Sequence, residues 1–195
     1  MHGLYEIVSW SLAGIVLLLL LLIVYASVRN GISPMPTSRP VRRMVMREIG
    51  RLPNRGHIVE AGSGFGTLAL NLTRRFPLCK VTGVENSLIP LLSSRLLASA
   101  NRMPRSRLSF RRGDLFAYEY ENADLVVCYL HPAAMRRLGP ILRERVADGT
   151  RVVSVFFAFD DWEPDTIAVC GDLYRTKVYT YTVRLPLEHP VDIRV

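Results

Sequence analysis

The chain has 195 residues and a formal net charge of +8, and 49% of its residues are hydrophobic against 22% charged. This length excludes two full domains, and the apolar content excludes a disordered basic tail. A basic net charge is typical of proteins that bind nucleic acid. Where the charge lies along the chain is therefore more informative about function than its total.

The first predicted element is an apolar helix over residues 7–28, which contain no charged side chain. At 1.5 Å per residue this segment spans about 33 Å, enough for a hydrocarbon core of about 30 Å. Trp10 and Tyr25 lie near its ends, where amphipathic aromatic residues prefer to lie. The flank before it has no Lys or Arg, unlike a secretory signal. We expect a retained transmembrane anchor; a cleaved signal and a buried or interfacial helix are the alternatives.

Residues 29–55 carry most of the excess charge, seven arginines against one glutamate. Because positive segments stay on the cytoplasmic side, we expect a single-pass protein with its N-terminus outside, in a bacterial inner membrane. Prolines and a glycine predict a linker over 29–40, and apolar spacing predicts a helix over 41–52. The chain is therefore divided into an anchor at 7–28, a basic juxtamembrane linker with a short helix at 29–55, and a folded, cytoplasmic domain at 56–195.

From residue 57 onward, predicted strands and helices alternate. The strand segments are continuous apolar runs, typical of a parallel sheet buried on both faces. This pattern predicts an α/β fold, a three-layer Rossmann-like sheet. Residues 172–185 alternate Thr, Tyr and Val with no helix, which predicts antiparallel edge strands at the C-terminus. The expected strands are 57–61, 80–84, 107–111, 123–130 and 150–159, and the expected helices are 67–76, 88–101 and 133–146.

A glycine loop follows the first predicted strand. Gly62, Gly64 and Gly66 allow a tight strand-to-helix turn that a ligand can approach closely, although such a turn alone can be purely structural. Glu60 precedes the loop, and Glu85 closes the next strand, where a carboxylate can accept hydrogen bonds from ribose hydroxyls. A dinucleotide loop would need glycine at position 67, which is threonine here.

This combined pattern resembles the class I, seven-β-strand S-adenosylmethionine-dependent methyltransferases, whose first motif is acid-x-Gly-x-Gly-x-Gly and whose second is an acid closing strand two. Gly113-Asp114-Leu115 looks like their adenine-contact motif. The resemblance implies that S-adenosyl-L-methionine is the cofactor, with Glu60 and the loop at its amino-acid part, Glu85 at its ribose, and Asp114 with Leu115 at its adenine. The cofactor-binding set implied is Thr37, Glu60, Gly62, Ser63, Gly64, Gly66, Glu85, Asn86, Asp114 and Leu115. No metal site is expected, because the three cysteines lack metal-ligand spacing.

A narrower group is also similar: membrane-anchored protein-lysine methyltransferases, whose mitochondrial members modify the adenine-nucleotide translocase and the ATP synthase c-subunit. The shared features are the N-terminal apolar segment, Pro36-Thr37, the 126–132 stretch and Trp162-Glu163-Pro164. This chain departs from that group at Phe65 and Thr67, where an acid and an arginine are usual. The resemblance implies N-methylation of lysine side chains in a membrane protein.

The methyl-acceptor pocket in this fold usually follows the fourth strand. Cys128-Tyr129-Leu130-His131-Pro132 lacks the Asn/Asp-Pro-Pro-aromatic motif of enzymes that modify base amines or amides, so a lysine amine fits better. Tyr129 could orient or desolvate that amine, and His131 could relay a proton or be an ordinary loop residue. The acids of residues 160–165 could attract a cationic segment or form a solvated loop.

Two other functions remain open at this point. One is methylation of a lipid, quinone or other small amphiphile, and the other is a non-enzymatic scaffold that binds the cofactor at a membrane. Six arginines and no acid lie between Arg95 and Arg112. They suit a solvated helix face or anionic lipid better than nucleic acid, because few aromatic residues are interleaved.

Overall fold

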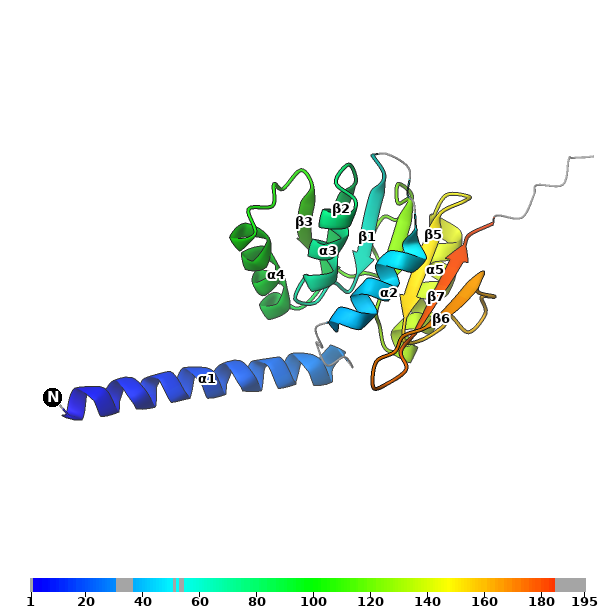
Figure 1. The fold of residues 1–195 in the computed structure, drawn as a ribbon. Helices are drawn as coiled ribbons and strands as arrows, with labels where there is room; N and C mark the ends of the chain where they lie inside the picture. The colour runs from blue at the N-terminus through cyan, green and yellow to red at the C-terminus, as the bar shows by residue number, and fades with distance from the viewer. Residues whose placement is uncertain (1, 31–36, 51, 53–54, 185–195) are drawn as a thin grey trace, which may run out of the picture. The chain divides into compact units, whose positions relative to one another are not determined.

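The computed structural model describes residues 2–30, 37–50, 52 and 55–184 (Figure 1). The chain divides into two compact units, Met1–Met35 and Pro36–Val195. The first contains helix α1 (His2–Asn30), of which Gly3–Leu22 is long and apolar enough to cross a membrane. A signal sequence near the N-terminus can have the same length and composition, so the span itself is a proposal.

The second unit is a seven-stranded sheet with the order β3-β2-β1-β4-β5-β7-β6. Strands β1 to β5 are parallel, and β7 is antiparallel to both β5 and β6. The predicted three-layer fold with antiparallel C-terminal strands is therefore confirmed. The strands are β1 (His57–Ala61), β2 (Lys80–Glu85), β3 (Leu108–Arg112), β4 (Leu125–Cys128), β5 (Arg151–Val155), β6 (Thr166–Val169) and β7 (Lys177–Thr182).

Helices cover both faces of this sheet. On one face α3 contacts both α2 and α4, while α5 lies on the opposite face (Figure 1). The central strands β1 and β4 are buried along nearly their whole length, as expected for apolar parallel strands between two helix layers. The helices are α2 (Arg39–Ile49), α3 (Thr67–Arg75), α4 (Leu88–Ala100) and α5 (Pro132–Arg145).

The largest departure from the expected elements concerns the end of β5. The apolar run predicted a strand to residue 159, but β5 ends at Val155 because Phe156 has a φ of +76°. A left-handed residue cannot continue a pleated strand. Strand β6 was not predicted, because its four residues are mostly exposed and follow the acidic loop directly.

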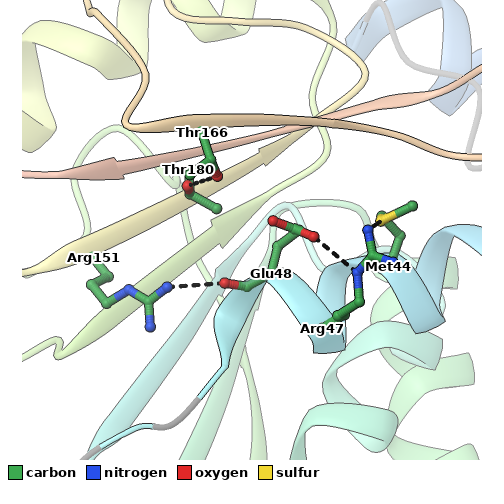
Figure 2. A network of polar contacts seen from close by, with 6 residues as sticks. All are labelled: Met44, Arg47, Glu48, Arg151, Thr166 and Thr180. Carbon is green, nitrogen blue, oxygen red and sulfur yellow. Dashed lines mark hydrogen bonds and ion pairs between the residues drawn. The ribbon is translucent and has the colours of Figure 1, made fainter.

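Helix α2 packs on the sheet with one face. Val41, Val45 and Ile49 recur at four-residue intervals and are buried. Arg151 on β5 donates hydrogen bonds to the Ile49 carbonyl and, at 3.0 Å, to the Glu48 carbonyl (Figure 2). These bonds satisfy carbonyls at the C-terminus of α2, which have no partner within the helix. Helix α2 is thereby held against β5 as part of the second unit.

Candidate cofactor and acceptor site

The glycine loop connects β1 to α3 at the carboxyl edge of the sheet. The Gly62 and Ser63 N–H groups both donate to the Val84 carbonyl of β2 at 3.0 Å, and the Gly66 N–H donates to the Ser63 carbonyl at 2.8 Å. The loop is thus held on β2, the strand that ends at Glu85. Ligands of open α/β sheets bind at this carboxyl edge.

The three glycines are required for different reasons. Gly62 and Gly66 have φ near +75°, and an added Cβ would lie 2.5 Å from Leu130 and from Phe110 respectively. Gly64 has φ +50°, and nothing lies within 4 Å of its Cβ position. Packing therefore excludes side chains at Gly62 and Gly66, whereas Gly64 leaves an open surface that a ligand could approach.

Glu85 faces this loop with a fixed carboxylate. Its Oε2 accepts a hydrogen bond from the Gly64 N–H at 2.9 Å, and its Oε1 accepts one from the Ser87 N–H at 2.8 Å. A carboxylate oxygen has lone pairs for two donors. Each oxygen can therefore accept a further bond from a ribose hydroxyl, which is the role expected for Glu85.

Glu60 and Ser63 contribute two buried polar atoms, Oε2 of Glu60 and Oγ of Ser63, that have no hydrogen-bond partner among the residues that the structure describes. Burial raises the pKa of the Glu60 carboxyl to about 8, the backbone N–H of Ala69 opposes the rise, and the negative charge of Glu85 adds to it. A cationic ammonium beside Glu60 would relieve this penalty. These unsatisfied atoms and the open side of Gly64 fit the amino-acid part of S-adenosylmethionine.

The segment after β3 closes the other side of the loop. The Leu115 side chain lies 3.9 Å from the Cβ position of Gly62, and the Gly113 N–H donates to the Glu85 carbonyl at 3.1 Å. The Asp114 carboxylate accepts a bond from the Phe116 N–H at 2.9 Å. Strand order thus brings Leu115 to the loop, some 50 residues away in sequence, and Asp114 directly precedes it. Their adenine contact remains a proposal.

Asn86 and Thr37 are placed differently. Asn86 is exposed beside Glu85, and its Oδ1 accepts a bond from the Ser87 hydroxyl at 3.0 Å. Thr37 is buried just before α2, and its carbonyl accepts a bond from Arg42. Asn86 therefore belongs to the carboxyl edge near Glu85, while Thr37 is part of the α2 segment, and the cofactor contact of each is untested.

The candidate acceptor side of the site is aromatic. Tyr129 follows β4, and its ring stacks on Phe156 with a centroid distance of 6.4 Å and an interplanar angle of 17°. The ring centroids of Phe156 and Phe157 are 4.9 Å apart. A bulky residue with positive φ is strained, and such strain is concentrated at functional sites. Phe156 was not predicted as a site residue; its one sequence signal is the aromatic pair that ends an apolar run.

Tyr129 keeps its phenol proton over the physiological range. Burial raises the pKa of the phenol, and the negative charge of Asp172 and the nearby Tyr174 raise it further. The β6–β7 turn, which carries both of these residues, is therefore close enough to Tyr129 to raise the pKa of its phenol. A neutral phenol can orient an amine by hydrogen bonding, but it cannot act as a base.

His131 and the acidic loop have more ordinary surroundings. His131 is the N-cap residue of α5, and no hydrogen bond to its ring is found in the described part of the chain. The Trp162 ring packs on Phe159 and Tyr181, and the Arg143 guanidinium lies 5.2 Å above it. Trp162 therefore already has a cation partner within the protein.

An α/β sheet of this order, with a glycine loop after β1 and a carboxylate at the end of β2, defines a class I S-adenosylmethionine-dependent methyltransferase. The family model described as "ANTKMT methyltransferase domain" matches residues 60–166. This match covers more than half of the chain, and the chain belongs to that family. S-adenosylmethionine is accordingly its cofactor.

Three similar proteins were found. A protein named protein-lysine N-methyltransferase from Saccharolobus islandicus (strain REY15A) is 27% identical over 149 residues, which are 73% of this chain and 88% of that protein. The crystal structure of an RNA methyltransferase from Salinibacter ruber in complex with S-adenosyl-L-homocysteine has 30% identity and a TM-score of 0.69, covering 83% of this chain and all of that one. Precorrin-6y C5,15-methyltransferase from Geobacter metallireducens GS-15 shares the fold, with 12% identity, a TM-score of 0.61, and coverage of 74% and 88%.

Proposed function

We propose that this methyltransferase is anchored in a membrane by α1 and transfers methyl groups to lysine side chains of a membrane protein. The observation that carries the acceptor assignment is the aromatic pair of Tyr129 and Phe156, which follow the carboxyl ends of the neighbouring strands β4 and β5. The relative from Saccharolobus islandicus is named for the same reaction.

The chemistry of an amine acceptor explains the aromatic surface. A free lysine amine has a pKa of about 10.4, so it must lose a proton before it can attack a methyl group. The aromatic rings of Tyr129 and Phe156 disfavour the charged form of the amine and so lower its pKa, and the proton leaves toward solvent. The neutral Tyr129 hydroxyl then accepts a hydrogen bond from the amine and orients its lone pair, and positioning of this kind supplies much of the rate.

The residues at the cofactor end of the site would bind the methyl donor. Bound S-adenosylmethionine supplies an electrophilic methyl group on a positively charged sulfur. Glu60 and Glu85 place two carboxyl groups around the glycine loop. They would bind the ammonium and the ribose hydroxyls respectively, and so would hold the cofactor at the carboxyl edge that also carries Tyr129. His131 remains a candidate for proton transfer on the acceptor side.

Anchoring would favour an acceptor in the same membrane. A membrane span confines the domain to a thin layer, which raises its effective concentration toward membrane proteins. The acids Asp160, Asp161 and Glu163 are exposed and would attract a lysine-bearing segment over a longer range. We place the domain on the cytoplasmic side, because the arginines follow the span.

The test is to incubate the full-length protein with radiolabelled S-adenosylmethionine and membranes from cells that lack it. We expect the label in the protein fraction and, by mass spectrometry, on lysine nitrogen. A Gly64→Ala variant provides the control with a damaged cofactor site. Label in an organic extract would instead support a lipid or quinone acceptor and contradict the lysine proposal.

RNA is the second candidate acceptor. It is favoured by the similarity to the Salinibacter ruber protein, which is named an RNA methyltransferase, and by the basic balance of this chain. The same incubation, supplied with total RNA, separates the two candidates. Label that is sensitive to ribonuclease and resistant to protease would assign RNA as the acceptor.

A further inference from the structure

The two faces of the sheet in the methyltransferase unit differ in charge. Helices α2, α3 and α4 together carry seven arginines and one acidic residue, Glu48. On the other face, Arg137 lies 4.0 Å over Phe116, and Arg143 bonds the Asp161 carbonyl, so α5 packs against segments 113–124 and 160–165. Those two segments contain eight acids and no base. Helix α5 itself carries four arginines and one acid, so acids outnumber bases nine to four on this face. The face of the sheet covered by α2, α3 and α4 is therefore the basic face of this unit.

Helix α4 adds an apolar ridge to this basic face. Leu88, Leu92 and Leu96 recur every four residues and are 51%, 52% and 71% exposed. Residues at this spacing lie on one side of a helix. The opposite side of α4, with Leu91 and Ala98, is already buried against the unit's core. The fold thus leaves three adjacent leucines in contact with solvent.

Exposed arginines follow this ridge. Arg102 and Arg105 come directly after α4, and Arg111 and Arg112 end β3, the strand that α4 contacts. No acid lies between Arg95 and Arg112. An exposed leucine ridge beside a run of arginines is the pattern of helices that lie in the interface of an anionic membrane.

We propose that the ridge of α4 and its neighbouring arginines dock the domain on an anionic lipid bilayer. The leucines enter the boundary between headgroups and acyl chains, and the arginines pair with lipid phosphates. This inference rests on the membrane anchoring proposed above. The seven peptide links from Asn30 to Thr37 reach at most about 25 Å, so an embedded α1 keeps the domain within range of the bilayer surface.

Docking in this way has a consequence for the acceptor. Helix α4 begins three residues after Glu85, at the carboxyl edge that carries the candidate site. A docked α4 therefore brings that edge close to the headgroup layer. The acceptor expected is a lysine that lies at the membrane surface, next to a transmembrane segment.

The test uses the full chain in nanodiscs made of lipids with brominated acyl chains, which quench a nearby fluorophore. A bimane label is attached to a Leu96→Cys variant; the three native cysteines are buried, so the label reacts at position 96. We expect at least twofold quenching in discs with 30% anionic lipid. The charge reversals Arg102→Glu and Arg105→Glu, made together, should remove it. An Ala147→Cys variant, labelled at an exposed position beyond α5, should stay unquenched.

Three outcomes would overturn the docking proposal. The first is absence of quenching at position 96, and the second is equal quenching at position 147. The third is a quenched signal that added RNA removes, which would assign the basic face to nucleic acid. The measurement needs neither cofactor nor acceptor: a chain that methylates lysine without quenching disproves docking alone, and a quenched chain that methylates no lysine disproves the proposed function alone.

Discussion

Gly64 is the residue of the glycine loop whose role is easiest to isolate. Gly64 and Gly149 both have positive φ and no atom within 4 Å of the Cβ position, but only Gly64 lies in the candidate site. We expect Gly64→Ala and Gly149→Ala to lower the free energy of unfolding by a similar amount, about 1–2 kcal/mol, because each forces alanine into a left-handed conformation. Chemical denaturation measures this loss.

Cofactor affinity should separate the two alanine variants. The new methyl group of Gly64→Ala projects into the space left for the ligand, so we expect at least a tenfold loss of affinity, about 1.4 kcal/mol. Gly149→Ala should bind normally. Calorimetric titration with S-adenosylmethionine provides the comparison, and equal affinities would show that the ligand does not approach Gly64.

Glu60 should make the stability of the cofactor-free protein depend on pH. Its folded pKa of about 8 lies above the ordinary value of 4.5, so between these values the unfolded chain releases a proton that the native state keeps. The stabilising contribution is complete below pH 4.5 and is lost as pH rises to about 8, at up to ~1.4 kcal/mol per pH unit. Denaturant unfolding from pH 5 to 8 should show this decline in the wild type but not in Glu60→Gln. Parallel pH profiles of stability for the wild type and Glu60→Gln would contradict the raised pKa of Glu60.

At the scale of elements, the attachment of α2 to β5 depends on Arg151. Its guanidinium bonds the Glu48 and Ile49 carbonyls, which lie in the last turn of α2. We expect Arg151→Met to lower the free energy of unfolding by about 1–3 kcal/mol. Arg47→Ala is the matched control, because Arg47 is 70% exposed and its partner Glu48 lies in its own helix, so its loss should cost less than ~1 kcal/mol. Equal losses in denaturation would show that α2 is held by its apolar face alone.

The turn after β5 permits a test of strain at Phe156. Both Phe156→Ala and Phe156→Gly remove the ring that stacks on Tyr129, but only glycine adopts a φ of +76° without penalty. We therefore expect the glycine variant to be the more stable of the two by about 1 kcal/mol. Both should transfer methyl groups more slowly, and differential scanning calorimetry with a methylation assay separates the two effects. A more stable alanine variant would contradict strain at this position.

At the scale of the whole molecule, the two compact units allow anchoring and catalysis to be separated. Among the described residues, those of the hydrophobic core come from the unit Pro36–Val195, so a chain that begins at Pro36 should fold. We expect it to leave the membrane fraction and still methylate an acceptor in detergent. Its rate on the same acceptor in an intact membrane should fall at least about tenfold, because the anchor no longer raises the effective concentration. Carbonate extraction followed by methylation assays tests both points, and an unchanged rate in membranes would show that the anchor has no role in acceptor choice.

The sequence by itself determined the class of fold and the cofactor loop. Apolar strands that alternate with helices predict a parallel sheet, and Gly62 to Gly66 between two carboxylates predict the ligand end of it. It also determined the position of the apolar N-terminal helix. These features are local, because periodicity and short motifs reflect the backbone geometry of neighbouring residues.

Only the tertiary structure decided what depends on strand order and on packing between distant residues. It placed Leu115 beside Gly62, stacked Phe156 on Tyr129, and left the Glu60 carboxyl buried without a full set of partners. It also placed the acids of segments 113–124 and 160–165 beside α5, on the face of the sheet opposite the arginines of α2, α3 and α4. Burial, through-space contact and a positive φ arise from the whole fold, and no spacing within one segment determines them.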